Sequence, residues 1–159
     1  MKPIKFLFAS LAALILAGCP SPTAQQNAAK ASQVASAAVV AAQQGEITVY
    51  NTGQQCLAAA QSPAQQGACI VIPPDDHQFL QREFVAISEL GKTLDSCILG
   101  STTTAGTVAC ANTALVTVNQ INADGALALK SDKAKTTFQL VITSVQVGIQ
   151  TIQALLGGS

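Results

Sequence analysis

Charge is scarce in this chain. Only 10% of its 159 residues are Asp, Glu, Lys or Arg, the formal net charge is zero, and there is a single histidine, His77. This length suits one small domain, and the charge balance leaves no basic patch for nucleic acid. Residues 96–123 and 136–159 contain no Asp, Glu, Lys, Arg or His. Segments so poor in charge prefer neighbours to water, which predicts helices packed in a bundle.

Residues for catalysis are also few. His77 follows Asp75 and Asp76 at the start of a predicted helix, which indicates a surface residue of the first turn. No Gly-x-Ser-x-Gly motif and no phosphate-binding glycine loop occur, and no carboxylate is evident to oppose the two aspartates. We therefore expect no enzyme activity and no cofactor, and these residues identify no small-molecule substrate.

The first residues have the pattern of an export signal. Lys2 and Lys5 precede an uncharged run over residues 6–17, which ends beside Gly18 and Cys19. The run falls short of the roughly 20 residues that a membrane-spanning helix needs, so a permanent transmembrane anchor is the weaker interpretation.

The segment Leu16-Ala17-Gly18-Cys19 resembles the lipobox of bacterial lipoproteins, in which a branched apolar residue and two small residues precede a cysteine. The resemblance covers residues 1–19 only. It implies cleavage of a signal peptide (residues 1–18), a diacylglyceryl group on the Cys19 thiol and an acylated amine. Two or three acyl chains anchor a protein firmly, whereas one binds only marginally. Membrane lipid is thus the first expected partner.

Residues 19–23 then read as the lipidated cysteine and a short spacer, and residues 24–159 as a helical domain. Pro20 follows Cys19. In enterobacterial lipoproteins an Asp at this position retains the protein in the inner membrane, so its absence favours the outer membrane, facing the periplasm or the cell surface.

Small residues recur along the start of the helical domain. The spacing alternates between four and three at positions 24, 28, 31, 35, 38, 42, 45, 49, 52, 56 and 59. This narrow stripe predicts one long helix with close helix contacts. Two collinear helices are the alternative if Gly45 and the β-branched residues after it interrupt the first.

The remaining helices are separated by turn signals. Ser62, Pro63 and Gly67 predict a loop, and Asp75 and Asp76 are expected as cap and first-turn acids of the next helix. That helix has the clearest apolar face, formed by Leu80, Phe84, Ile87, Gly91, Leu94 and Ile98.

A Thr-rich turn over residues 100–106 leads to a helix predicted over 108–122, and Asp124, Gly125, Ser131 and Asp132 suggest a further connection. The last helix is expected from Ser131 or Asp132 to Gly157. Its inner face comprises Phe138, Val141, Val145, Gly148, Ile152 and Leu155, with glutamines on its wet edge. The predicted fold is all-α, a small antiparallel bundle of about four helices.

Four cysteines follow Cys19, namely Cys56, Cys69, Cys97 and Cys110. In an oxidising compartment they are expected to form disulfides, for which three connectivities exist. Pairing 56 with 69 and 97 with 110 is the simplest, because each bond would clamp one hairpin. The offset of 41 between the pairs hints at a duplicated hairpin. A zinc site is disfavoured because closely spaced cysteine pairs and a second histidine are missing.

These features lead to a hypothesis of a lipid-tethered, non-enzymatic envelope protein that adds structure or binds another envelope protein. One alternative is a phage- or plasmid-encoded lipoprotein that excludes superinfection. Another is a lipid-binding or membrane-active helical protein whose bundle opens.

Overall fold

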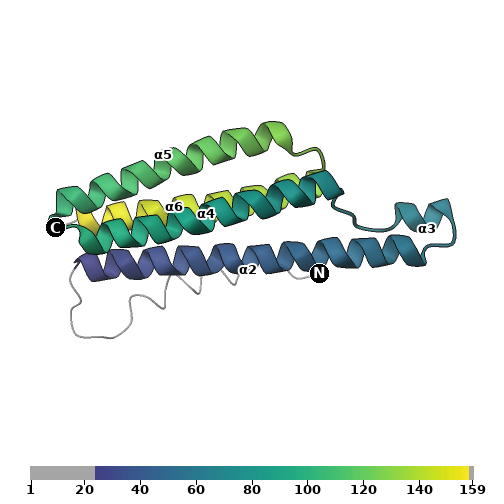
Figure 1. Cartoon of the computed structure of the whole chain (residues 1–159), viewed down its shortest axis with the longest axis horizontal. Helices are drawn as coiled ribbons and strands as arrows, with labels where there is room; N and C mark the ends of the chain where they lie inside the picture. Colours follow the sequence, from purple (N-terminus) through teal and green to yellow (C-terminus); the bar gives the residue numbers. More distant parts are fainter. Residues whose placement is uncertain (1–23, 158–159) are drawn as a thin grey trace.

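A computed structural model describes residues 24–157 as five α-helices, with no strand in that range (Figure 1). They are α2 (Ala24–Ala59), α3 (Pro63–Gly67), α4 (Pro74–Gly100), α5 (Thr104–Ala128) and α6 (Asp132–Gly157). The four long helices form an antiparallel bundle in which α2 and α5 each pack against both α4 and α6. The all-α fold and the predicted hairpins are therefore confirmed.

Helix α2 is continuous, and Gly45 does not interrupt it. Its buried face differs from the predicted stripe, however. Gly45, Thr52, Cys56 and Ala59 are exposed, and the buried positions run instead through Ser32, Val39, Glu46 and Gly53. In this part of α2 the buried face thus lies one residue after the predicted stripe, although Val49 of the stripe stays half-buried against the core.

Small residues on α2 let two other helices approach it closely. A Cβ atom added at Gly148 of α6 would lie 2.9 Å from the Cβ of Ala35, and one added at Gly91 of α4 would overlap the Ser36 hydroxyl. Both contacts occur at one level of α2. The glycines and the alanines therefore set the narrow spacing of the bundle at this level.

Larger side chains fill the rest of the core. The predicted inner face of α4 is buried except for the half-buried Gly91, and Phe138, Val141, Val145 and Ile152 of α6 are buried as predicted. At the end of α6 Leu156 is buried and Leu155 only partly, so that position was misassigned by one residue.

Three local predictions were wrong. Residues 63–67 form the short helix α3 rather than a loop, because the Ser62 hydroxyl accepts a hydrogen bond from the Gln65 backbone N–H and Pro63 suits the first helical turn. Helix α5 begins earlier and ends later than 108–122, so the connection to α6 shrinks to residues 129–131. Gly125 lies inside α5, where a Cβ would overlap the ring of Phe138.

Helix α6 carries an apolar stretch, Asp132–Leu156, that is long enough and apolar enough to cross a membrane by length and composition alone. In the bundle one of its faces packs against α2 and α5.

Candidate functional site

The predicted lipidation residue, Cys19, and the signal peptide lie outside the described residues. The first described residue, Ala24, begins α2 at the end of the bundle that also holds the α4–α5 turn and the last turn of α6 (Figure 1). At the other end, α2 and α3 extend past the start of α4. We call residues 51–71 of this extension the tip.

The tip is closed by the first disulfide. Cys56 in the last turns of α2 bonds to Cys69 after α3, with a Cα–Cα distance of 5.7 Å. A Cβ at Gly53 would lie 2.5 Å from the Ile70 carbonyl oxygen, so glycine allows the returning chain to lie directly on α2. The tip contains no Asp, Glu, Lys, Arg or His and carries six Asn and Gln residues: Asn51, Gln54, Gln55, Gln61, Gln65 and Gln66. It is an uncharged, cross-linked projection.

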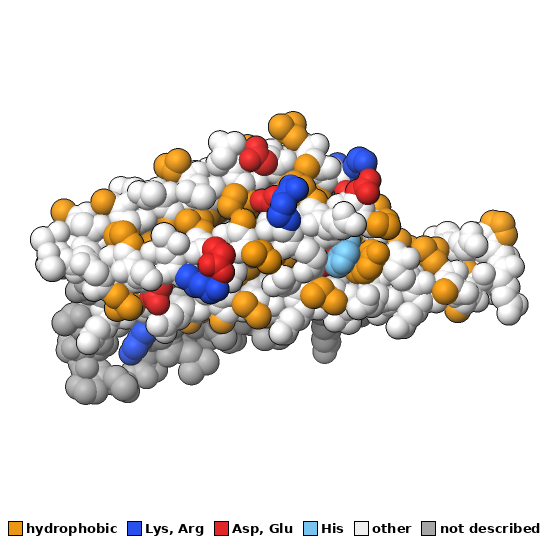
Figure 2. All heavy atoms as spheres, in the orientation of Figure 1, with side chains coloured by type: hydrophobic (Ala, Val, Ile, Leu, Met, Phe, Trp, Pro, Cys, Tyr) orange, Lys and Arg blue, Asp and Glu red, His pale blue; other side chains and the backbone are white. Residues whose placement is uncertain are grey.

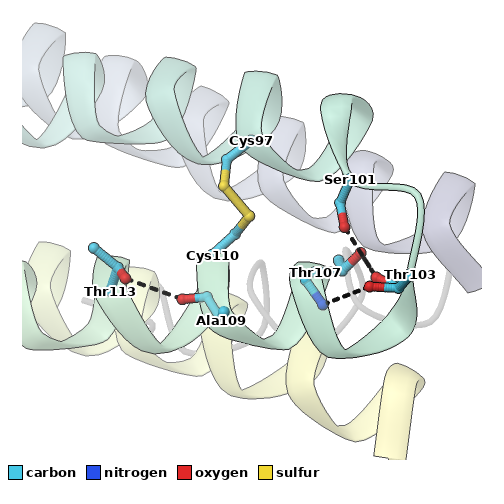
Figure 3. Close-up of a disulfide and its surroundings, with 8 residues drawn as sticks. Cys97, Ser101, Thr103, Thr107, Ala109, Cys110 and Thr113 are labelled. Carbon is cyan, nitrogen blue, oxygen red and sulfur yellow. Dashed lines mark hydrogen bonds between the residues drawn. A yellow bond between two sulfur atoms is a disulfide. The ribbon is translucent and has the colours of Figure 1, made fainter.

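The second disulfide lies at the opposite end of the bundle. Cys97 in the last turn of α4 bonds to Cys110 in the second turn of α5, with a Cα–Cα distance of 5.9 Å (Figure 3). Thr103 organises the turn, because its hydroxyl accepts from the Gly106 N–H and its carbonyl accepts from the Ser101 hydroxyl. Both predicted cysteine pairings are thus confirmed.

The offset of 41 residues extends beyond the cysteines. Helices α2 and α4 end at Ala59 and Gly100, and α3 and α5 begin at Pro63 and Thr104, each after a hydroxyl cap. The two hairpins of the predicted duplication differ in their second helix, because α3 ends at Gly67 whereas α5 continues to Ala128. The duplication stays a prediction. It is supported by helix ends and N-caps that recur at the same offset as the cysteines.

A buried carboxylate that the sequence did not single out lies at the base of the tip. Glu46 of α2 is 2% exposed. One carboxylate oxygen lies 2.9 Å from Nδ1 of His77 on α4, and the other accepts a hydrogen bond from the Gln81 side-chain amide. Gln43 in turn donates to Gln81 at 2.9 Å. The four side chains form a polar chain that joins α2 to α4.

The imidazole of His77 is held from a second side. The ring of Tyr50 stacks on it with centroids 3.8 Å apart and an angle of 6° between the planes. The His77 side chain retains 21% exposure and is visible on the surface in Figure 2. Its predicted place in the first turn of α4 is correct, but it is a half-buried partner of a buried acid rather than a simple surface residue.

This arrangement is a base held by an orienting carboxylate, which covalent catalysis also requires. The imidazole forms a hydrogen bond with the Glu46 carboxylate and stacks on the Tyr50 ring. Within residues 24–157 no group of three His, Cys, Asp or Glu side chains is placed to hold a metal ion. The geometry there is that of a clamp between α2 and α4.

Asp76 forms a second clamp, between the start of α4 and the start of α6. Asp76 is 1% exposed and accepts hydrogen bonds from the backbone N–H groups of Lys130 and Ser131 at 3.0 and 2.7 Å. The N-cap of α4 is Pro73, so the two aspartates are first-turn acids but neither caps the helix as predicted. Burial alone would raise the pKa of Asp76, but the hydrogen bonds from Ser131 and Lys130 outweigh it and hold the pKa below the usual 3.8.

This depressed pKa predicts acid sensitivity. A carboxylate with a lower pKa in the folded state stabilises the fold fully above its unfolded pKa, about 3.9, and loses that contribution as the pH falls through the folded value. Replacing Asp76→Asn should destabilise the domain by about 1–3 kcal/mol at pH 7, because the amide has a single acceptor oxygen and one of the two backbone N–H groups would lose its acceptor. The difference from wild type should shrink below pH 4 in denaturant titrations; an unchanged difference at pH 2 would contradict the assignment.

An apolar groove with a volume of about 240 Å³ lies between α4 and α5. Leu90, Leu94 and Ala114 line it, and the Cys97–Cys110 disulfide forms part of its wall. It offers a place for a small apolar group.

No protein-family model, no curated protein and no solved structure matches this chain. No activity can therefore be transferred to it from a relative.

Proposed function

We propose that the protein is a lipid-anchored component of a bacterial cell envelope that adds structure or binds another envelope protein and catalyses no reaction. The observation that carries the proposal is the Leu16-Ala17-Gly18-Cys19 segment directly after an apolar run, followed by a disulfide-clamped helical bundle. Disulfides fit an oxidising compartment outside the cytoplasm.

The chain direction of α2 indicates which end of the bundle would face the membrane. Four residues lie between Cys19 and Ala24, and an extended chain of the five residue steps from one to the other spans at most about 17 Å. Helix α2 has 36 residues and is therefore about 54 Å long. A lipid on Cys19 would hold the near end of the bundle at the membrane and leave the uncharged tip furthest from it. We place the protein in the outer membrane, because no Asp follows Cys19.

A second candidate function, lipid binding or membrane insertion, is favoured by the groove between α4 and α5 and by the apolar stretch of α6. Lipid recovered with the purified protein, together with leakage of vesicles treated with it, would favour this function. A lipid-free protein that leaves vesicles intact would favour the first.

The anchor is tested by Cys19→Ser in cells labelled with radioactive palmitate. We expect the variant to take up no label and to keep its signal peptide, because both acyl transfer and the subsequent cleavage depend on the Cys19 thiol. Cys56→Ser is the matched control and should label normally, since this thiol is committed to a disulfide. Normal labelling and maturation of Cys19→Ser would rule out the proposed anchor.

A further inference from the structure

Charge is distributed unevenly over the helices of the bundle. In the view of Figure 2, acidic and basic side chains are spread along the bundle, and many of them belong to α4, which carries Arg82, Glu83, Glu89, Lys92 and Asp95. Helix α6 is diagonal to α4 and has no Asp, Glu, Lys, Arg or His after Lys135. Among the residues that the structure describes, the side of the bundle formed by α6 is therefore uncharged after Lys135.

The outward face of α6 repeats with coiled-coil spacing. Its exposed positions alternate steps of four and three, through Thr136, Leu140, Thr143, Val147, Gln150 and Ala154. Leu140 and Val147 are 61% and 54% exposed. This stripe lies opposite the residues that α6 buries in its own bundle. Leu140 and Val147, one heptad apart, are the two large apolar side chains of the stripe.

Helix α5 continues this face beside α6. Val116 is 70% exposed, and residues 104–123 of α5 carry no charged side chain. Between the helices runs a seam of three amide pairs, each with a Gln of α6 donating to an Asn of α5 at 2.7–2.9 Å: Gln139–Asn122, Gln146–Asn119 and Gln153–Asn112. The two helices thus present one joined surface.

One hydroxyl group of the α6 stripe is already hydrogen-bonded within its own helix. Thr136 donates to the backbone carbonyl of Asp132 at 2.8 Å. Covering Thr136 would therefore leave its donor paired.

We propose that this face of α5 and α6 is where two copies of the chain pack against each other. An uncharged patch brings no like-charge repulsion when it meets itself across a two-fold axis. Two adjacent helices about 30 Å long and roughly 10 Å apart offer about 600–800 Å² per copy, which approaches the roughly 800 Å² per partner of a standard interface. Asp132, Lys133 and Lys135 flank the stripe at one end, as a polar rim.

A protein occupant fits the face better than lipid does. Gln150 lies exposed in the stripe. The side-chain amide of each seam glutamine has two N–H groups, and the hydrogen bond to the asparagine oxygen uses one of them. Hydrocarbon cannot satisfy the remaining donors, whereas a second copy supplies matching amides and carbonyls. The pairing does not depend on lipid attachment, so failure of palmitate labelling would leave it intact.

The test uses the full-length chain in the membranes of expressing cells. Single cysteines are introduced as Leu140→Cys, Val147→Cys or Ala154→Cys, and mild oxidant is added; the native cysteines 56, 69, 97 and 110 are already paired. Val85→Cys on α4 is the matched control, since Val85 is 52% exposed and Val147 is 54%. We expect a band at twice the monomer mass from at least one α6 variant and none from the control.

Light scattering on the purified protein supplies the second measurement. The wild type and Val85→Glu should have the mass of two copies, and the double variant Leu140→Glu/Val147→Glu the mass of one, with unchanged helical circular dichroism. Absence of a cross-link at all three α6 positions, together with a single-copy mass for the wild type, would overturn the proposal. Equal cross-linking from Val85→Cys would overturn it as well.

Discussion

Removal of the Cys97–Cys110 bond by Cys97→Ala/Cys110→Ala should lower the melting temperature of the domain by about 10 °C. The bond closes a loop with a sequence separation of 13, which is worth about 3 kcal/mol in the chain-entropy model. For a domain of this size, each kcal/mol corresponds to roughly 3–4 °C. The effect should be global, because Cys110 is buried and the bond joins two helices of the bundle.

The Cys56–Cys69 bond offers a matched comparison with the same sequence separation of 13. Cys56→Ala/Cys69→Ala should shift the global melting temperature less and should instead lower hydrogen-exchange protection in residues 54–71, because the tip extends past the bundle. Calorimetry and exchange mass spectrometry on both variants check the contrast. Equal shifts in melting temperature with unchanged protection of the tip would show that the tip unfolds only with the bundle.

Breaking the Glu46–His77 pair should have the next largest effect. His77→Ala leaves a carboxylate that is 2% exposed with one fewer donor, and losing a hydrogen bond to a charged group costs about 1.5–3 kcal/mol. Glu46→Gln removes the charge but keeps an acceptor, so the double variant should be less destabilised than the sum of the single variants. Urea titrations of the four proteins give the coupling, which we expect at about 1–2 kcal/mol.

The matched control for this pair is Gln78→Ala. Gln78 is the next residue of α4 and is exposed. It should change the stability by less than about 0.5 kcal/mol. Additive effects of His77→Ala and Glu46→Gln would mean that the two side chains do not stabilise each other. That result would contradict the claim that the pair holds α2 against α4.

The long helices and the cysteine pairing could be predicted from the sequence for clear physical reasons. The apolar face from Leu80 to Ile98 lies opposite exposed charged residues such as Arg82 and Glu89, so it favours one orientation toward the core. Each cysteine pair flanks a turn, and the short loop between its members favours local closure. Such features depend on residues close in sequence.

The features that were missed depend on residues far apart in sequence. Glu46 was overlooked because the predicted α2 stripe passes through Gly45, whereas the face that α2 buries against α4 and α6 lies one residue later, through Val39, Glu46 and Gly53. Asp76 was expected to act locally, but its acceptors meet donors 54 and 55 residues away. Gly125 was interpreted as a turn signal, but it lies within α5, where the absence of a Cβ atom leaves space for the Phe138 ring of α6.

Lipid attachment at Cys19 is the central claim, and the mass of the mature N-terminal peptide tests it most directly. Protein extracted from membranes with detergent should yield a peptide that begins at Cys19 and carries the added mass of two or three acyl chains. A mature chain that begins at another residue, or an N-terminal peptide containing an unmodified Cys19, would contradict it.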